Sequence, residues 1–315
     1  MSDTPSFSVV TVLKENLETS MEFVRWYKRL GAREIIMFFD DPNDPAIAKL
    51  ADTEGVIAIG CDPAFWDSIG QFDGKKFVKR QNAALNHGYR MVTSDWVLAV
   101  DSDEKLYDAA GLLTHRLAGV APECRAIRSE STEALKCVEP GTTKMFRTPM
   151  TSEQITDIYG EEAWLFRRRN GLVGHYQGKS IIRAGQQDIR LRQHWAEDHE
   201  RNKIGDLMLT ARDGIYLLHQ IGADYAVWRE KLEWRNEAWG FARYINQHMT
   251  ELRQNNDEDG LEQLYRSLHE ADAAKIAKMR SAGVLVELDA AEIEPVTETE
   301  QPSIFGLLFG KILGK

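Results

Sequence analysis

The sequence predicts an α/β protein built on a mostly parallel sheet with flanking helices, followed by C-terminal helices. Three observations predict this class. From Phe7 to about Val120, short apolar runs alternate with helical stretches, the order expected of parallel strands joined by crossover helices. Two of these runs end abruptly in aspartate-rich turns. From Tyr225 to Ala282 the pattern is helical, with a polar break at Asn255–Gly260.

Local signals predict the elements in order. Thr19 and Glu22 form a capping box that opens a first helix, and Gly31 ends it. Pro45 suits the first turn of a short second helix. A helix rich in polar side chains is expected over Lys75–Tyr89. The expected strands are Ser8–Leu13, Glu34–Phe39, Val56–Gly60, Trp96–Val100, Ser180–Arg183, Ile189–Arg192 and Gly214–Leu218.

We expect four parts along the chain. Residues 1–222 form the α/β domain, and residues 223–284 form a helical extension. Residues 285–302 are acidic and poor in large apolar side chains, which predicts a linker. Residues 303–315 (SIFGLLFGKILGK) place apolar side chains and two lysines at near-helical spacing, which predicts a short amphipathic tail. A tail this short would make only weak peripheral contact with a membrane or with protein.

Composition excludes several classes of protein. The 315 residues are 43% apolar and 28% charged, which is typical of a globular protein. The net charge of −10 repels a phosphate backbone, so no nucleic-acid partner is expected. Cys61, Cys124 and Cys137 are far apart and predict neither a disulfide framework nor a thiolate zinc site. With no signal-peptide pattern and no apolar run of roughly 20 residues, the predicted location is the cytoplasm, with peripheral membrane association left open.

Asp101 and Asp103 follow the buried strand Trp96–Val100 and give the strongest chemical signal. Alternate side chains of an extended chain share one side, so both are expected to face the crevice beyond the carboxyl end of the sheet. Two carboxylates there suit Mn²⁺ or Mg²⁺, which keeps positions open for phosphate oxygens. A similar acidic run at Asp257–Asp259 has no strand before it and predicts only a solvated turn.

Asp40 and Asp41 follow the strand Glu34–Phe39 and are expected over the same edge of the sheet. Alone they would indicate an Asx turn before a helix. Together with Asp101 and Asp103 they predict an edge that holds a base or ribose, because carboxylates accept hydrogen bonds from sugar hydroxyls.

Two segments carry a family resemblance. VLKENLETSMEFVRWYKRLGAREIIMFFDDPND and RQNAALNHGYRMVTSDWVLAVDSDEKL resemble the glycosyltransferase family 2-like group, close in pattern to the family 92-type proteins. Later fragments, GHYQGKSIIRAG, RLRQHW and IYLLHQIGADYAVWREK, are similar to later segments of that family. The resemblance implies a GT-A-type, Rossmann-like fold. It also implies metal-dependent transfer of a sugar from a UDP- or GDP-sugar donor to a glycan or other hydroxyl acceptor.

The same resemblance implies roles for single residues. Asp101 and Asp103 would bind the divalent metal and the diphosphate, and Lys179 would place a positive charge beside the leaving diphosphate. His194 and His219 could each complete the metal shell through a neutral imidazole, although a lone histidine is also a common structural residue. The residues expected to bind the nucleotide sugar are Lys14, Glu15, Asp40, Asp41, Arg80, Gln81, Asp101 and Lys179.

Sugar transfer also needs a base that deprotonates the acceptor hydroxyl. Asp103, Glu130 and Glu162 are the candidate catalytic carboxylates, and no spacing singles out one of them. The expected enzyme is an inverting, hexosyltransferase-type glycosyltransferase.

Three other functions remain as alternatives. Phosphoryl transfer by an aspartate also places D-x-D after a strand, but Glu104 and Lys105 stand where such enzymes usually continue to Thr or Val. A nucleotidyltransferase would need a glycine-rich loop after the first strand, and residues 14–17 contain no glycine. A non-catalytic nucleotide-sugar-binding or scaffold protein with the same fold is the third alternative.

Overall fold

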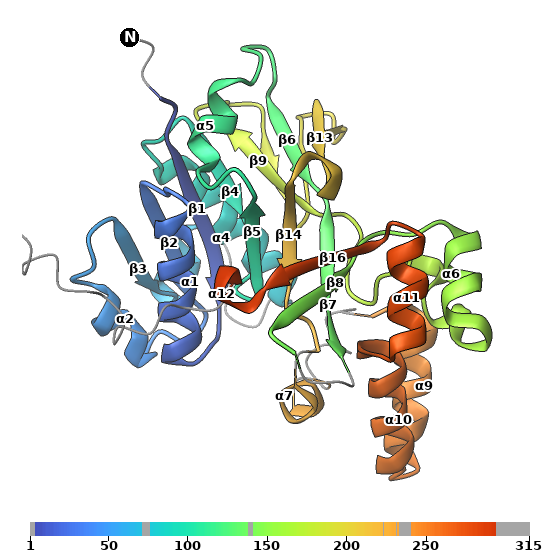
Figure 1. The fold of residues 1–315 in the computed structure, drawn as a ribbon. Helices are drawn as coiled ribbons and strands as arrows, with labels where there is room; N and C mark the ends of the chain where they lie inside the picture. Colours follow the sequence, from blue (N-terminus) through green and yellow to red (C-terminus); the bar gives the residue numbers. More distant parts are fainter. Residues whose placement is uncertain are drawn as a thin grey trace, which may run out of the picture.

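The computed structural model describes residues 4–70, 76–137, 141–222, 224–230, 232 and 241–293. Within them the chain forms a seven-stranded sheet, a six-stranded sheet and a small three-stranded sheet, with helices around them (Figure 1). The seven-stranded sheet has the order β13-β6-β9-β4-β1-β2-β3. Its strands are β1 (Phe7–Leu13), β2 (Glu34–Phe39), β3 (Val56–Gly60), β4 (Trp96–Ala99), β6 (Ala126–Ser129), β9 (Lys179–Arg183) and β13 (Leu207–Leu209).

This large sheet is mostly parallel, as predicted. Strand β1 pairs in parallel with both β2 and β4, and β2 pairs in parallel with β3, whereas β9 is antiparallel to both of its neighbours. Alternate residues of β1 face opposite layers: Val9 packs with Phe23 of α1, and Val10 packs with Leu85 of α4. The helices of this part are α1 (Leu17–Arg29), α2 (Pro45–Leu50), α3 (Pro63–Ser68), α4 (Phe77–Met91) and α5 (Leu113–Ala118).

The second large sheet meets the first at two places along the chain. A short turn joins β4 to β5, and the single residue Glu130 separates β6 from β7. The order of this sheet is β16-β8-β7-β14-β5, with β15 added beside β7. Its strands are β5 (Glu104–Asp108), β7 (Ser131–Cys137), β8 (Thr143–Arg147), β14 (Ile215–His219), β15 (Glu270–Ala271) and β16 (Leu285–Asp289). The small sheet contains β10 (Arg190–Leu191), β11 (Ala196–Glu197) and β12 (Lys203–Ile204), so the strand expected over Ile189–Arg192 has only two residues.

Helices gather beyond β7 and β8 on one side of the molecule (Figure 1). They share a second apolar core in which Trp228, Phe241, Tyr265 and Leu268 are buried. The helical pattern predicted for Tyr225–Ala282 is therefore confirmed for the described residues, apart from the two residues of β15. The helices of this side are α6 (Ser152–Tyr159), α7 (Tyr225–Glu230), α9 (Arg243–Gln254), α10 (Glu258–His269) and α11 (Ala273–Ser281), with 3₁₀ turns η1 (Gly160–Leu165) and η2 (Arg167–Arg169). Helix α12 (Ala290–Ile293) and the 3₁₀ turn η3 (Ala211–Asp213) instead pack against the first core.

The prediction of a linker over residues 285–302 is wrong for its first part, which forms a strand and a short helix. Strand β16 pairs antiparallel with β8 over five residues, and α12 returns to α1, where Arg29 donates a hydrogen bond to the carbonyl of Glu292 at 3.2 Å. The acidic composition concealed an alternating strand, in which Leu288 packs on the core while Glu287 and Asp289 stay outside. Residues 294–302 and the predicted amphipathic tail, 303–315, lie outside the described residues.

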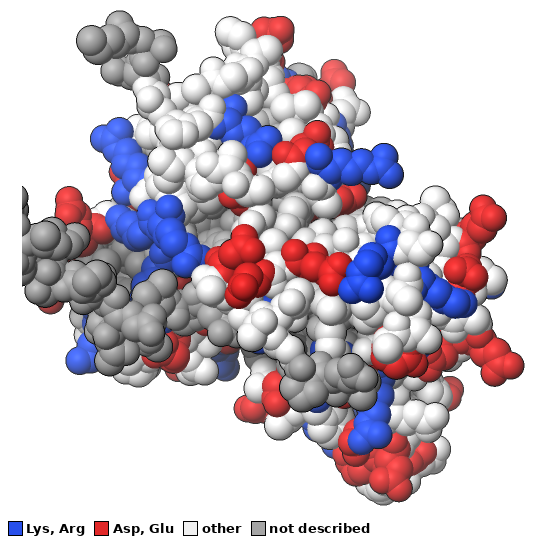
Figure 2. Space-filling model, in the orientation of Figure 1, with Lys and Arg blue, Asp and Glu red and all other residues white. Residues whose placement is uncertain are grey.

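Charged side chains of both signs are spread over the visible surface. Figure 2 shows basic and acidic side chains interspersed on the face drawn, with acidic side chains gathered near the tip of α9 and α10. In the described part of the chain, no helix has both the length and the apolar character needed to span a membrane.

A buried ion pair connects the second sheet with the helical side. Glu133 of β7 and Arg147 of β8 are cross-strand partners, and their side chains are 0% and 1% exposed. Arg147 Nη2 lies 2.8 Å from Glu133 Oε2, and Nη1 donates to the carbonyl of Leu268 in α10 at 2.9 Å. Because a buried charge without its partner is costly, this pair makes the two parts interdependent.

We predict that Arg147→Met lowers the free energy of unfolding by about 3–5 kcal/mol, because it leaves the carboxylate of Glu133 buried and unpaired. Urea denaturation followed by circular dichroism measures the loss. Arg280→Met is the control, since Arg280 pairs with Glu287 at the surface and should cost far less. Equal losses for the two variants would contradict the assignment.

Candidate functional site

The turn between β4 and β5 carries the candidate site. Asp101 and Asp103 lie in this turn, and Glu104 is the first residue of β5. The backbone N–H of Glu104 donates to the carbonyl of Asp101 at 3.1 Å, and that of Gln220 donates to the carbonyl of Asp103 at 3.0 Å. The turn is thereby tied to the end of β14, whose last residue is His219.

Helix α1 fixes the start of β5 from the other side. The hydroxyl of Tyr27 donates to the carbonyl of Glu104 at 3.0 Å and accepts from the N–H of Leu106 at 3.1 Å. The indole N–H of Trp26 donates to the carbonyl of Leu106 at 2.9 Å. Burial raises the pKa of Tyr27, which keeps its hydroxyl protonated and able to donate.

Lys179, the first residue of β9, is a buried positive charge among these carboxylates. Its Nζ donates to Asp101 Oδ2 at 2.7 Å and to the carbonyl of Gln193 at 2.9 Å, and it lies 3.0 Å from Glu104 Oε2. The side chain of Lys179 is 1% exposed and that of Glu104 is fully buried. Burial opposes the charged ammonium, but the two carboxylates outweigh it and raise the pKa of Lys179. The lysine is therefore charged.

Asp101 is engaged through both carboxylate oxygens. Oδ1 accepts from Gln81 Nε2 at 2.7 Å, and Oδ2 accepts from Lys179. Desolvation by the surrounding residues raises the pKa of Asp101 to about 6, and Lys179 limits that rise. The structure thus brings together three residues that the sequence predicted for nucleotide-sugar binding.

Glu104, His175 and His219 each bring one potential ligand atom within 4.8 Å of the others. His175 Nε2 lies 2.6 Å from Glu104 Oε1, and His219 Nε2 lies 3.6 Å from Asp103 Oδ2. The ring of His194 lies against that of His175, with their centroids 4.0 Å apart. One carboxylate and two imidazoles form a donor set suited to a divalent transition metal. We call Glu104, His175 and His219 the histidine cluster.

The imidazoles of this site differ in protonation. Within the described residues, the buried Nδ1 atoms of His175, His194 and His219 have no hydrogen-bond partner. Burial holds the pKa values of His175 and His194 well below the ordinary value, with Lys179 adding to the effect, so both rings are neutral as a metal requires. For His219, burial also disfavours the charge, but Asp103 outweighs it and raises the pKa to about 9. An ion bound through His219 would replace that proton.

The Glu133–Arg147 pair also holds the loop that carries His175. The carboxylate of Glu133 accepts from the backbone N–H groups of Val173 at 2.7 Å and Gly174 at 2.6 Å. A Cβ atom at Gly174 would lie 2.8 Å from His219 Cε1 and 3.0 Å from Glu133 Oε1. Glycine at this position therefore allows the loop to approach His219.

Other predicted nucleotide-binding residues lie where β1, β2 and β4 end. Arg80 Nη2 donates to both oxygens of Asp40, at 3.0 and 3.1 Å, and its guanidinium lies over the ring of Trp66. Glu15 accepts from the hydroxyl of Ser102 at 3.1 Å, which places the start of α1 beside the acidic turn.

Two further predicted residues are exposed. Lys14 follows β1, and Asp41 follows β2, where its Oδ1 accepts from the N–H of Asn43 at 2.9 Å in an Asx turn. Since β1 and β2 are parallel neighbours, both residues lie over the same edge of the sheet as Asp40 and Glu15.

Two predicted catalytic carboxylates have partners elsewhere. Glu162 in η1 accepts from Ser267 at 2.6 Å and from Lys275 Nζ at 2.8 Å on the helical side. Glu130 accepts from the N–H of Ala211 at 3.2 Å, and burial raises its pKa. In the described ranges, no recorded hydrogen bond or ion pair joins either residue to the histidine cluster.

Sequence analysis did not single out Glu104 or His175 as candidate ligands. Glu104 follows the D-x-D directly and was considered only as evidence against phosphoryl transfer. His175 lies on a loop without a second ligand at a recognisable spacing, and its partner Glu104 is 71 residues away. Only the fold brings the two together.

No protein-family model matches the chain, and no curated protein matches it. Comparison with solved structures gives weak likenesses. The mannosyltransferase PcManGT from Pyrobaculum calidifontis, in complex with GDP-Man and Mn²⁺, is 11% identical with a TM-score of 0.38, over 90% of this chain and 76% of that one. HddC from Yersinia pseudotuberculosis is 10% identical with a TM-score of 0.37, over 71% of this chain and 98% of that one. At these values the function must be argued from the site itself.

We predict that Gly174→Ala weakens Mn²⁺ binding by roughly tenfold or more, because the added methyl group displaces His219 or Glu133. Isothermal titration calorimetry on metal-free protein measures the affinity. Gly119→Ala is the control, since the nearest atom to its Cβ would be 3.6 Å away. An unchanged affinity in Gly174→Ala would contradict this prediction.

Proposed function

We propose that this protein is a metal-dependent glycosyltransferase with a GT-A-type fold. It would move a sugar from a UDP- or GDP-sugar to a hydroxyl acceptor in glycan or polysaccharide assembly. One observation carries the proposal: Asp101 and Asp103 meet Lys179 and the histidine cluster at the carboxyl edge of a parallel sheet. Open α/β sheets bind ligands at this edge, and the residues there combine cation ligands with positive charge.

The histidine cluster would hold a divalent cation, with Asp103 beside it and the ring of His194 against that of His175. Two imidazole donors favour Mn²⁺ over Mg²⁺, which prefers oxygen ligands. The bound ion would neutralise negative charge on the leaving diphosphate. Asp101, predicted from the sequence as a ligand, faces Gln81 and Lys179, and we propose that it positions these two side chains.

The nucleotide sugar would lie across the ends of β1, β2 and β4. Asp40, Asp41 and Glu15 supply acceptors for ribose hydroxyls and base N–H groups, and Lys14 and Arg80 supply donors. The guanidinium of Arg80 is held in place by both oxygens of Asp40. Lys179 would donate to a diphosphate oxygen.

Asp103 is the candidate base that the geometry favours. Its side chain is 30% exposed, so it can reach a ligand, and it lies beside His219. Glu162 and Glu130 contact residues away from the histidine cluster, as described above. A single carboxylate base acting on the acceptor hydroxyl predicts an inverting reaction, which NMR of the product's anomeric proton would show.

Asp103→Asn is predicted to lower turnover of the donor by roughly a hundredfold or more, while the protein remains folded. Mass spectrometry of the sugar product measures turnover. Asp259→Asn is the matched control, because Asp259 belongs to the exposed acidic run at the start of α10 and should leave turnover unchanged. Turnover retained in Asp103→Asn would contradict the proposed role.

Metal removal provides an independent prediction. After treatment with EDTA, a nucleotide sugar is expected to raise the melting temperature only when Mn²⁺ is also added, because ligand bound to the folded state stabilises it. A screen of UDP- and GDP-sugars with and without Mn²⁺ measures this. Stabilisation that is independent of Mn²⁺ would contradict metal dependence, and stabilisation without any sugar product would favour the non-catalytic binding protein.

A further inference from the structure

The ammonium of Lys179 already neutralises carboxylates of the candidate site. It contacts Asp101 Oδ2 at 2.7 Å and Glu104 Oε2 at 3.0 Å, and its side chain is 1% exposed. Without this cation, Glu104 would be a buried carboxylate whose recorded side-chain partner is the imidazole of His175. Lys179 therefore stabilises the acidic turn when no metal ion is bound.

Glu104 belongs to two arrangements at the same time. Its Oε2 accepts from the backbone N–H of Asp101 at 2.8 Å and contacts Lys179, and its Oε1 contacts His175 in the histidine cluster. A divalent ion bound by the cluster would share this carboxylate with the ammonium. Two positive charges on one carboxylate repel each other, and the repulsion is strong here because the side chains of Glu104 and Lys179 are buried away from solvent.

We propose that Lys179 competes with the divalent cation for Glu104. The divalent ion alone therefore binds weakly. Tight binding requires a ligand with a diphosphate, which accepts the hydrogen bond that Lys179 no longer donates to Glu104. The inference rests on the proposed function, since it takes the histidine cluster as the cation site. Ion and diphosphate would then each tighten the binding of the other by the same factor.

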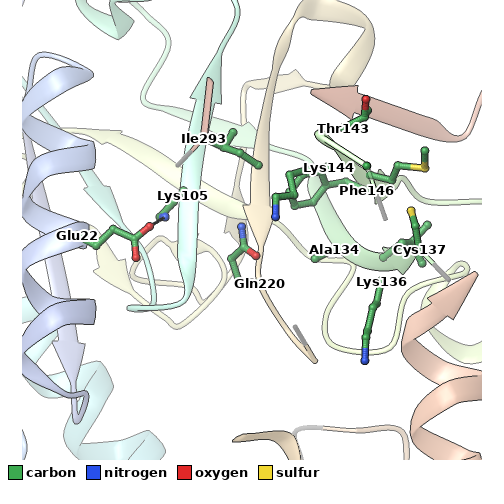
Figure 3. Close-up of a pocket in the computed structure, with 13 residues that line it drawn as sticks. Glu22, Lys105, Ala134, Lys136, Cys137, Thr143, Lys144, Phe146, Gln220 and Ile293 are labelled. Carbon is green, nitrogen blue, oxygen red and sulfur yellow. Dashed lines mark hydrogen bonds and ion pairs between the residues drawn. The ribbon is translucent and has the colours of Figure 1, made fainter. Parts of the chain in front are cut away.

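Four proteins test the competition: the wild type, Lys179→Met, Lys179→Arg and the control Lys105→Met. Lys105 follows Glu104 but points to the opposite face of β5, where it pairs with Glu22 in a pocket of about 490 Å³ (Figure 3). It is thus a partly buried, ion-paired lysine of the same sheet that lies outside the histidine cluster. Mn²⁺ affinity is measured by calorimetry on the full chain after EDTA treatment, without nucleotide.

Lys179→Met is expected to bind Mn²⁺ more tightly than the wild type by roughly tenfold or more, because a neighbouring positive charge is removed. Lys105→Met is expected to match the wild type. In a second titration with UDP or GDP present, the nucleotide should tighten Mn²⁺ binding by a larger factor in the wild type than in Lys179→Met. Lys179→Arg, which keeps the charge, should resemble the wild type.

Contrary outcomes separate this inference from the proposed function. If the wild type binds Mn²⁺ and Lys179→Met binds it equally or more weakly, the competition is wrong and the cation site stands. If neither protein binds Mn²⁺, with or without nucleotide, the cation site is wrong and both proposals fail.

Lys179→Met also leaves two carboxylates without their cation, so its folding must be followed by circular dichroism. If the variant is unfolded in EDTA, the proposal predicts that Mn²⁺ restores the folded state, because the ion then takes the place of the ammonium. A variant that stays unfolded in Mn²⁺ would overturn the proposal.

Discussion

One buried carboxylate, that of Glu104, joins parts of the chain that are far apart in the sequence. It accepts a hydrogen bond from the acidic turn, contacts Lys179 at the start of β9 and lies 2.6 Å from His175. A carboxylate removed from water is costly unless charged or polar partners surround it. The turn, the strand and the loop must therefore be placed together, and placing them together also assembles the proposed cation site.

The two large sheets explain why this carboxylate can be buried at all. Strand β4 belongs to the mostly parallel sheet, and β5 belongs to the second sheet. The turn that joins them is therefore covered by β14 and by the loop before β9. Behind that loop, the Glu133–Arg147 pair fixes the backbone of Val173 and Gly174. The Glu133–Arg147 pair therefore both stabilises the fold and positions the loop that carries His175 beside His219.

Local pattern was sufficient to predict strands β1 to β4 and helices α1, α2 and α4, because each depends on its own apolar spacing and turn residues. The six-residue helix α3 was not predicted. The acidic turn at Asp101 and Asp103 and the terminal histidine of β14 were also visible locally. The pairing of Asp101 with Lys179, 78 residues later, and of Glu104 with His175 was not, because burial and charge balance arise only in the assembled fold. Strand β16 was not predicted for a related reason. Its acidic residues indicated a linker, and its short alternation of apolar and acidic residues forms a strand only because it pairs with β8.

Anomalous diffraction from crystals grown with Mn²⁺ and UDP or GDP would test the central claim most directly. We expect a manganese peak bound by Glu104, His175 and His219, with a diphosphate beside it and the Nζ of Lys179 directed to that diphosphate. A peak held by Asp101 and Asp103 without the histidines, or no peak near this turn, would contradict it.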